Sequence, residues 1–312
     1  MSRAGSRSAA EIVRLRDEEG QLEARFVPEA GMICCSLRHR GEELLAQVGG
    51  LAEYEHDGHT MGIPLLYPWA NRLSRRRFEL AGQEVVIDPD ATPLRLDDNG
   101  LPMHGLLSGV EGWRVERHES SDDGGVLAAG FDFAAHHALI AAFPFPHRID
   151  FEATLAGPAL TIATTVIPTG DDPVPIAFGF HPFLQLPGVA RREWEIEIPV
   201  QEQLRLDPDM LPTGERIPAH VAPGRLGSRT FDDAYTAPPD GAPFALSGGG
   251  RRIELAFDTG YGFSQVYAPA DDDVIAYEPM TAPTNALVDG GEALRLVPPG
   301  ERYRAAFSIT VR

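Results

Sequence analysis

The sequence predicts an all-β protein with a single large domain. Seven segments alternate apolar and polar residues, which is the pattern of half-buried β-strands. They are residues 84–88, 113–118, 147–155, 159–167, 194–200, 252–258 and 303–311. The chain has 32 Gly and 27 Pro, together 59 of 312 residues, and many of them stand between these segments as turn formers. The alternation of strands and helices that is typical of a doubly wound sheet is missing.

The strand-like segments continue from about Leu22 to the end of the chain without a linker, so we expect one β-sandwich domain over residues 11–312. Residues 1–10, rich in Ser, Arg and Ala, are expected to form a loose tail. We expect helix only near residues 50–55, as about one turn. The acidic runs at residues 97–98, 122–123 and 271–273 lie in turn-like stretches and are expected to be solvated loop charges.

The charge balance excludes several classes of protein. The chain carries 46 Asp and Glu against 27 basic residues, a formal charge of −19, whereas proteins that bind nucleic acid present basic patches to the phosphates. We therefore expect no nucleic-acid partner. All 27 basic residues are Arg, which excludes a Schiff-base lysine and the lysine of a phosphate-binding P-loop.

The cysteines and the apolar runs indicate the cellular compartment. Cys34 and Cys35 are neighbours, and adjacent cysteines seldom meet disulfide geometry without strain. The first twenty residues lack the apolar stretch of a secretory signal, and no apolar run is long enough to span a bilayer. We therefore expect a cytoplasmic protein without a membrane partner.

Five segments place polar or ionisable residues among aromatics, Gly and Pro, a combination that suits a sugar, whose C–H faces stack on rings while its hydroxyls need hydrogen bonds. The segments are 62–74 (GIPLLYPWANRLS), 101–107 (LPMHGLL), 178–186 (FGFHPFLQL), 231–235 (FDDAY) and 276–287 (AYEPMTAPTNAL).

His181 and Glu278 are the candidates for acid–base chemistry. A proline follows each of them, and proline confines the preceding residue to an extended backbone, so both side chains are expected to be held in a restricted orientation at a strand end. A carboxylate and an imidazole could together move two protons. The alternative for His181 is an ordinary core histidine among phenylalanines.

Two further segments hold candidate binding residues. Arg72, after Trp69 and Asn71, could fork onto adjacent hydroxyls or form a surface ion pair, the role we expect for residues 75–77. His104 precedes Gly105, which permits a close backbone approach; it could equally be a turn histidine. The pair at 136–137 has no further ligand at a standard spacing, so we expect no structural zinc. Signatures of serine hydrolases and of dinucleotide-binding folds are missing as well.

These five segments, in this order, resemble the aldose 1-epimerase (galactose mutarotase-like) family over about residues 23–311. The likeness is strongest in PWANRLS, MHGLL, FPFPHRIDFEATL leading to PIAFGFHPFL, and YEPMTAPTNAL. It implies a β-supersandwich that binds sugar on the concave face of one sheet, without cofactor or metal. Pro-Phe-Leu follows His181 where galactose-type members have Tyr-Phe-Asn, and Pro168 stands where Asn is common, so the chain resembles divergent bacterial members.

The resemblance also implies roles for single residues. Glu278 matches the general base and His181 the general acid of a mutarotase, which opens and recloses the sugar ring. His104 matches a histidine near the ring oxygen, and Arg72, next to Asn71 in the same motif, matches a sugar-contacting arginine. Asp232 matches the carboxylate that binds sugar hydroxyls, with Asp233 as the alternative.

The implied activity is interconversion of the α and β anomers of a hexose, with a free monosaccharide such as glucose or galactose as the partner. Three alternatives stay open. The first is an epimerase of a hexose phosphate or another anionic sugar, the second a non-catalytic carbohydrate-binding protein, and the third a β-sandwich without a ligand. The preferred anomer and the oligomeric state stay open too.

Overall fold

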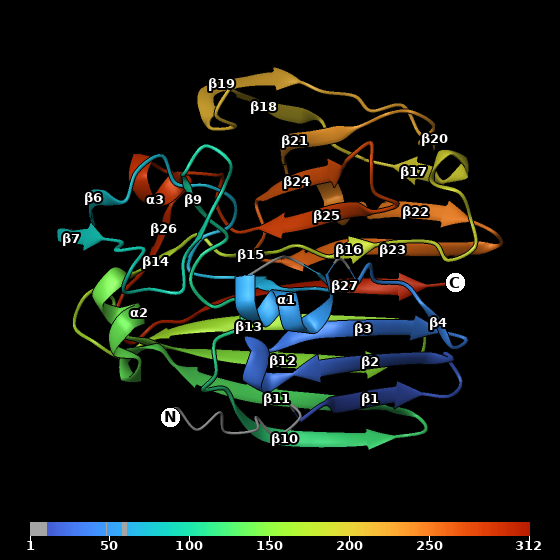
Figure 1. Cartoon of the computed structure of the whole chain (residues 1–312), viewed down its shortest axis with the longest axis horizontal. Helices are drawn as coiled ribbons and strands as arrows, with labels where there is room; N and C mark the ends of the chain where they lie inside the picture. Colours follow the sequence, from blue (N-terminus) through green and yellow to red (C-terminus); the bar gives the residue numbers. More distant parts are fainter. Residues whose placement is uncertain (1–10, 48, 58–60) are drawn as a thin grey trace, which may run out of the picture.

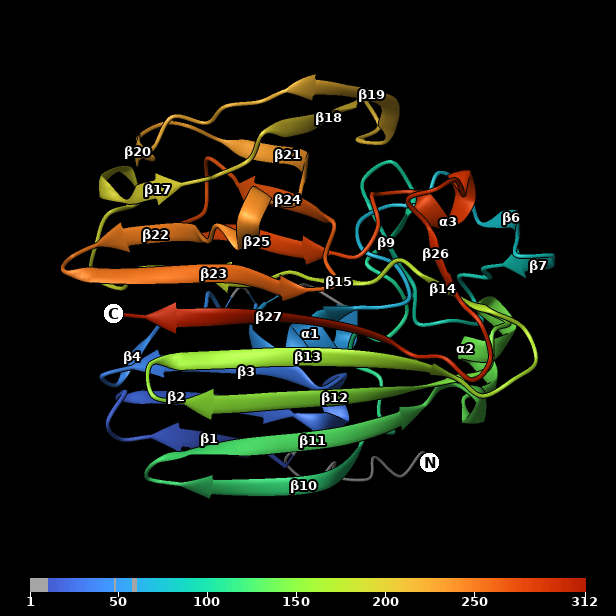
Figure 2. The ribbon, with the colours of Figure 1, turned by 180° about the vertical axis from the view of Figure 1, so that it is seen from behind.

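The computed structural model describes residues 11–47, 49–57 and 61–312, which form two stacked layers of antiparallel sheet (Figures 1 and 2). Residues 1–10, the expected loose tail, lie outside the described residues. The all-β fold class predicted from the alternating segments is confirmed, because strands from both ends of the chain contribute to one hydrophobic core that runs from Val13 to Val311.

One layer is a single nine-stranded sheet, whose long central strands are clearest in Figure 2. Its spatial order is β10 (Arg114–Ser121), β11 (Gly124–Asp132), β12 (His147–Ala156), β13 (Ala159–Pro168), β27 (Tyr303–Val311), β23 (Arg251–Thr259), β22 (Phe244–Gly248), β17 (Glu195–Glu197) and β20 (Gly224–Arg225). The C-terminal strand β27 lies in the middle of the sheet, so the end of the chain is part of the core.

The other layer consists of two sheets side by side (Figure 1). The first is four-stranded, in the order β1 (Val13–Asp17), β2 (Leu22–Val27), β3 (Ile33–His39) and β4 (Glu42–Glu43). The second is eight-stranded, in the order β19 (Pro212–Pro218), β18 (Glu202–Leu206), β21 (Phe231–Thr236), β24 (Phe263–Ala268), β25 (Ile275–Met280), β15 (Gly179–Phe180) and β5 (Leu65–Leu66), with β16 (Phe183–Leu184) also paired to β25.

Short elements fill the remaining edges. Three strand pairs stand apart: β14 (Val174–Ile176) with β26 (Arg295–Val297), β6 (Arg77–Leu80) with β7 (Gln83–Val86), and β8 (Arg95–Leu96) with β9 (Pro102–Met103). The α-helices are α1 (Gly50–Asp57), α2 (His137–Ala142) and α3 (Ala286–Asp289). The 3-10 turns are η1 (Pro28–Ala30), η2 (Phe133–Ala135), η3 (Arg191–Glu193) and η4 (Pro239–Gly241). No helix in the described ranges has the length and apolar character needed to cross a membrane.

Aromatic residues join the two layers. Phe26 of β2 meets Phe151 of β12 at 5.8 Å between ring centroids. Tyr277 of β25 stacks on Phe244 of β22 at 5.0 Å, and its hydroxyl donates a hydrogen bond to the backbone oxygen of Ala245. Because neighbours along a strand point to opposite faces, the inward position of Tyr277 turns Glu278 away from the nine-stranded sheet.

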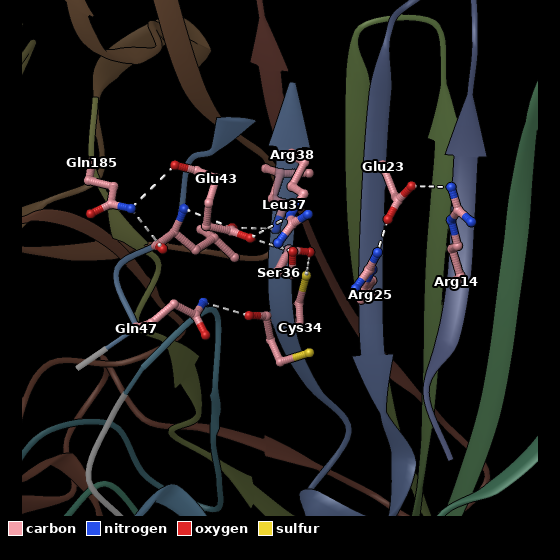
Figure 3. A network of polar contacts seen from close by, with 12 residues as sticks. Arg14, Glu23, Arg25, Cys34, Ser36, Leu37, Arg38, Glu43, Gln47 and Gln185 are labelled. Carbon is pink, nitrogen blue, oxygen red and sulfur yellow. Dashed lines mark hydrogen bonds and ion pairs between the residues drawn. The ribbon is translucent and has the colours of Figure 1, made fainter. Parts of the chain in front are cut away.

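A polar network connects the four-stranded sheet to the eight-stranded one (Figure 3). The Glu43 carboxylate accepts hydrogen bonds from the backbone NH groups of Leu37 and Leu45, at 2.9 and 3.2 Å. The side-chain amide of Gln185, just after β16, donates to the backbone oxygens of Glu43 and Leu45, each at 3.2 Å. This network fixes the place of β16, which carries Phe183.

All seven predicted strands are present, and most of their ends lie within a few residues of the predicted ones. The segment at 194–200 keeps strand structure only over β17, and β10 is exposed at every residue rather than half-buried, because it is the edge of its sheet. The expected turn near residue 50 is α1, while α2 and α3 were not predicted. Cys34 and Cys35 are both free thiols.

Candidate active site

The six residues proposed for the site, although distant in sequence, line one cleft of about 580 Å³ on the outward face of the eight-stranded sheet. They are Asn71, Arg72, His104, His181, Asp232 and Glu278. The fold brings them together because β5, β15 and β25 are neighbours in this sheet and the loops after β5 and β9 reach over its edge. Pockets of this volume are typical of small-molecule sites.

His181 and Glu278 face each other in this cleft. Nε2 of His181 lies 3.2 Å from Oε1 of Glu278, and the two side chains are only 7% and 2% exposed. The imidazole stacks on the Phe183 ring at 3.9 Å between centroids with an interplanar angle of 12°, so its orientation is held by packing. His181 directly follows β15, as predicted for a strand end, whereas Glu278 lies inside β25, which continues through Pro279.

Burial disfavours the charged forms of both groups. Desolvation, with a smaller contribution from the Asp232 carboxylate, raises the pKa of Glu278 well above its usual range, although Arg72 opposes the effect. Desolvation, and then the nearby Arg95 guanidinium, lowers the pKa of His181 to about 3. Burial thus favours the neutral form of each group over its charged form.

His104 is placed by an unusual backbone. Its φ of 62° is in the left-handed region, and its backbone NH donates to the oxygen of Asn71, itself at φ 55°. The predicted close approach at Gly105 is confirmed, because a Cβ there would lie 2.1 Å from the backbone oxygen of Tyr67. The His104 ring meets His181 edge-on at 5.7 Å. Desolvation, followed by the interaction with the neighbouring His181, lowers the pKa of His104 well below its usual range.

Arg72 forms an ion pair inside the cleft rather than on the surface. Its Nε donates to Oδ2 of Asp97 at 2.7 Å, and the side chains are 14% and 6% exposed. The prediction that Asp97 is a solvated loop charge is therefore wrong. Its other oxygen, Oδ1, accepts from the backbone NH groups of Asn99 and Leu101. Burial alone would raise the pKa of Asp97, but these hydrogen bonds and the guanidinium outweigh it and lower the pKa.

The two candidate aspartates point to opposite faces of β21. Asp232 lines the cleft and accepts a hydrogen bond from Nε2 of Gln265 at 2.6 Å. Asp233 is turned to the other face, where its Oδ1 accepts from Nε2 of Gln203 at 2.8 Å. The geometry therefore favours Asp232 over Asp233 as the carboxylate that meets a ligand.

Sequence reasoning missed several residues of the cleft. Arg95, Tyr267 and Phe183 line it, and Gln265 lies directly beneath it. Tyr267 is the cross-strand partner of Asp232, a relation that depends on strand register and has no local sequence signal. In the parts of the chain that the structure describes, no group of His, Cys, Asp and Glu could hold a metal ion.

The sequence profile of the family described as aldose 1-epimerase matches residues 19–310. This chain belongs to the aldose 1-epimerase family. Its match spans both layers of the sandwich and every residue of the cleft named above. No curated protein matches the sequence of this chain.

Solved structures share its fold. The Slr1438 protein from Synechocystis sp. PCC 6803 is 23% identical, the match covers 100% of this chain and 99% of that chain, and the TM-score is 0.77. A galactose mutarotase-like protein from Clostridium acetobutylicum is 16% identical, with 94% and 93% covered and a TM-score of 0.81. Galactose 1-epimerase from Lactobacillus acidophilus is 12% identical, with 97% and 99% covered and a TM-score of 0.73. The galactose mutarotase-like β-supersandwich is thus confirmed.

Proposed function

We propose that this member of the aldose 1-epimerase family is a mutarotase that interconverts the α and β anomers of a free hexose. The observation that carries the proposal is the buried pair in the cleft, with Nε2 of His181 at 3.2 Å from Oε1 of Glu278. The anomeric hydroxyl and the ring oxygen of a hexose are bonded to the same carbon. A base for one and an acid for the other must therefore converge on one small volume, as this pair does.

The proposed reaction needs two proton transfers. Glu278 as carboxylate removes the proton from the anomeric hydroxyl, while protonated His181 gives its proton to the ring oxygen, so the bond between the anomeric carbon and the ring oxygen breaks and the free aldehyde forms. Rotation about the adjacent carbon–carbon bond presents the other face of the aldehyde. On reclosure both transfers are reversed: His181 takes back the proton of the former ring hydroxyl, Glu278 gives its proton to the aldehyde oxygen, and the other anomer forms.

In the proposed mechanism, the pair already holds the required proton before a sugar binds. It resides on Glu278, and its transfer to His181 across the 3.2 Å contact creates a carboxylate and an imidazolium together. No proton needs to be exchanged with solvent. A bound sugar that accepts a hydrogen bond from His181 and donates one to Glu278 stabilises the charged pair.

The other cleft residues fit the binding of hydroxyl groups. Because Asp97 occupies Nε of Arg72, the terminal guanidinium nitrogens are directed to the ligand in the proposal, where they meet sugar hydroxyls. Asp232 accepts hydrogen bonds from hydroxyls, and Asn71 at the edge of the cleft adds an amide. His104 is neutral because its pKa is lowered, so it donates to the ring-oxygen side without adding charge. The names galactose mutarotase-like protein and galactose 1-epimerase of two structural neighbours support the same reaction class.

A second candidate substrate is an anionic sugar such as a hexose phosphate. The observation in its favour is Arg95, a second guanidinium that lines the cleft beside Arg72. Against it stand the carboxylates of Asp98, Asp232 and Asp272 in the same lining, and the net charge of −19, which repels an approaching anion. A neutral hexose is therefore the substrate that we favour.

Exchange NMR between anomers tests the proposal, with glucose, galactose, glucose 6-phosphate and a sulfonated sugar as substrates. Glu278→Gln is expected to reduce the enzyme-dependent rate by roughly 10²–10⁴-fold, the usual contribution of one positioned acid–base group. Because burial favours the neutral carboxyl of Glu278, a neutral amide of the same shape should leave the unfolding temperature unchanged. Glu301→Gln, an exposed position, is the matched control.

Each outcome has a distinct meaning. Exchange of the neutral sugars that is lost in Glu278→Gln supports the mutarotase, and exchange confined to the anionic sugars supports the second candidate. Wild-type rates in Glu278→Gln contradict the assignment of the base. Saturable binding without exchange of any sugar indicates a carbohydrate-binding protein instead.

A further inference from the structure

Gln265 lies beneath the cleft between Asp232 and Glu278. On strand β24 it is directly opposite Glu278 of β25, and it is only 2% exposed. Side chains directly opposite each other on antiparallel strands have their Cβ atoms about 4.5–5.5 Å apart, close enough to interact. Gln265 is not among the residues that line the cleft.

The orientation of the Gln265 amide is set by Asp232. Nε2 of Gln265 donates to Oδ1 of Asp232 at 2.6 Å, and an amide oxygen in that position would face a carboxylate oxygen with no proton between them. Oε1 of Gln265 and Oε2 of Glu278 are both buried, and neither has a hydrogen-bond partner among the described residues. Asp232 thus leaves the amide with an acceptor, and not a donor, on its other side.

A buried hydrogen-bond acceptor beside a carboxyl group favours the protonated form of that carboxyl group. An amide oxygen can accept a hydrogen bond from a protonated carboxyl, whereas an amide NH₂ can donate to a carboxylate. The two ends of a glutamine amide have nearly the same shape, so a half-turn of the group needs little space. What opposes the half-turn is the hydrogen bond to Asp232.

We propose that Gln265 is a positioning residue that couples the sugar-binding carboxylate Asp232 to the base Glu278. Before a sugar binds, the amide oxygen is available to Glu278 as an acceptor. When a sugar hydroxyl takes over Oδ1 of Asp232, the amide turns and donates from its NH₂ to Oε2 of Glu278. The base therefore becomes ready when the sugar is in place. This inference rests on the proposed mutarotase function.

Other charged and titratable groups also face Glu278. They are His181 after β15, Asp232 on β21, Tyr267 on β24, Arg72 and His104 on the loops, and Arg95 on β8. Their charges act on Glu278 through space whether residue 265 is Gln or Leu. A test of the coupling must therefore separate this direct effect of Asp232 from the effect that passes through Gln265.

A double-mutant cycle makes that separation. The four proteins are the wild type, Asp232→Asn, Gln265→Leu and the double variant, with the Glu278 carboxyl titrated by NMR in protein labelled with ¹³C at the glutamate carboxyls. Glu278→Gln identifies the signal. Asp232→Asn favours the charged form of Glu278 in both backgrounds, because it removes a negative charge. With Gln265 present it also lets the amide turn, because the Asn amide can pair with either end of the Gln265 amide. The ratio of charged to neutral Glu278 should then rise about three- to tenfold more, the effect of one hydrogen bond.

Gln203→Leu is the matched control, because Gln203 makes the same amide-to-aspartate bond with Asp233 on the opposite face of the sheet. Only Gln265→Leu should change the titration of Glu278 and the pH profile of kcat/KM. Gln265→Leu should remain folded, since leucine fills a similar volume and Asp232 is exposed to water; thermal unfolding checks this. Equal effects of Asp232→Asn in both backgrounds would overturn the coupling. The titration needs no turnover, so failure of the mutarotase proposal is recognised separately, by absent anomer exchange.

Discussion

Glu278 and His181 show how burial prepares a reactive pair from ordinary side chains. Each is more than nine-tenths buried, and desolvation opposes the charge of each, so in the proposed mechanism the pair holds a single proton before a sugar binds. Their titration belongs to the pair rather than to either residue. The state that reacts in the proposed mechanism carries the same number of protons as the resting state.

The pH dependence of activity follows from that proton count. As pH falls, a second proton enters the pair at His181, whose pKa is lowered to about 3, and Glu278 can no longer become a base. As pH rises, the single proton leaves Glu278, whose pKa is raised, and His181 has none to donate. We expect kcat/KM to stay level through pH 6.5, where an unperturbed histidine acid would lose its proton, and to fall at higher pH, as the proton leaves Glu278. Anomer exchange measured across this range checks it. A decline centred near the ordinary histidine pKa contradicts the shared proton.

Asp97 orients Arg72 and also stabilises the loop of residues 97–101. One carboxylate oxygen accepts from Nε of Arg72 and the other from two backbone NH groups of residues 99 and 101. Asp97→Ala removes both connections, and we expect KM to rise about tenfold, the value of roughly one lost hydrogen bond to a charged group, with a smaller effect on kcat. Asp97→Asn keeps an oxygen for the loop but not the charge, so its KM should lie between those of the wild type and Asp97→Ala. Steady-state kinetics on the best substrate measure this; an unchanged KM in Asp97→Ala contradicts the role.

Some of the secondary-structure elements that position the site are very short. β5 and β15, which bring the loop of Asn71 and the ring of His181 beside β25, have two residues each, so no periodicity can predict them. The long strands were predictable because alternation over eight to ten residues is a strong signal, as in β12 and β13.

Site residues were predictable where the neighbouring sequence marks them, and not where strand register alone brings them to the site. His181 and Glu278 each precede a proline, and His104 precedes a glycine that the backbone requires. Gln265 was missed because its place between Asp232 and Glu278 comes from the pairing of three strands. The error at Asp97 has the opposite cause: its local sequence is that of a turn, but the turn folds back onto Arg72.

The β1–β2 turn is tied to the nine-stranded sheet by one buried carboxylate. Oδ1 of Asp17 accepts from the backbone NH of Gly20 at 2.6 Å, and Oδ2 from that of Gly157 in the β12–β13 turn at 2.7 Å. Asp17 is 3% exposed. Asp17→Ala leaves both donors without this acceptor, and we expect unfolding to become easier by roughly 2–3 kcal/mol. Chemical denaturation measures the change, with Asp122→Ala, at an exposed position, as the control. Equal stabilities of the two variants would show that the bonds do not hold the turn.

At the scale of the whole molecule, paired charges and the net negative charge affect stability differently. Many of the 27 arginines form ion pairs with carboxylates on the sheet surfaces, such as Arg252 with Glu197 at 2.6 Å and Arg148 with Glu116 at 2.6 Å. Exposed pairs of this kind contribute little each. The remaining net charge of −19 acts over longer distances and opposes the compact state.

Salt should therefore stabilise the folded chain. The Debye length falls from about 30 Å at 0.01 M salt to about 8 Å at 0.15 M, so repulsion between distant carboxylates is screened, whereas paired charges only about 3 Å apart are screened much less. We expect the unfolding temperature to rise by a few degrees as NaCl increases over this range, since 1 kcal/mol corresponds to roughly 2–4 °C in a chain of this size class. KCl should act equally, because the effect depends on ionic strength alone. An unfolding temperature that falls over the same range would mean that the surface ion pairs outweigh the net repulsion.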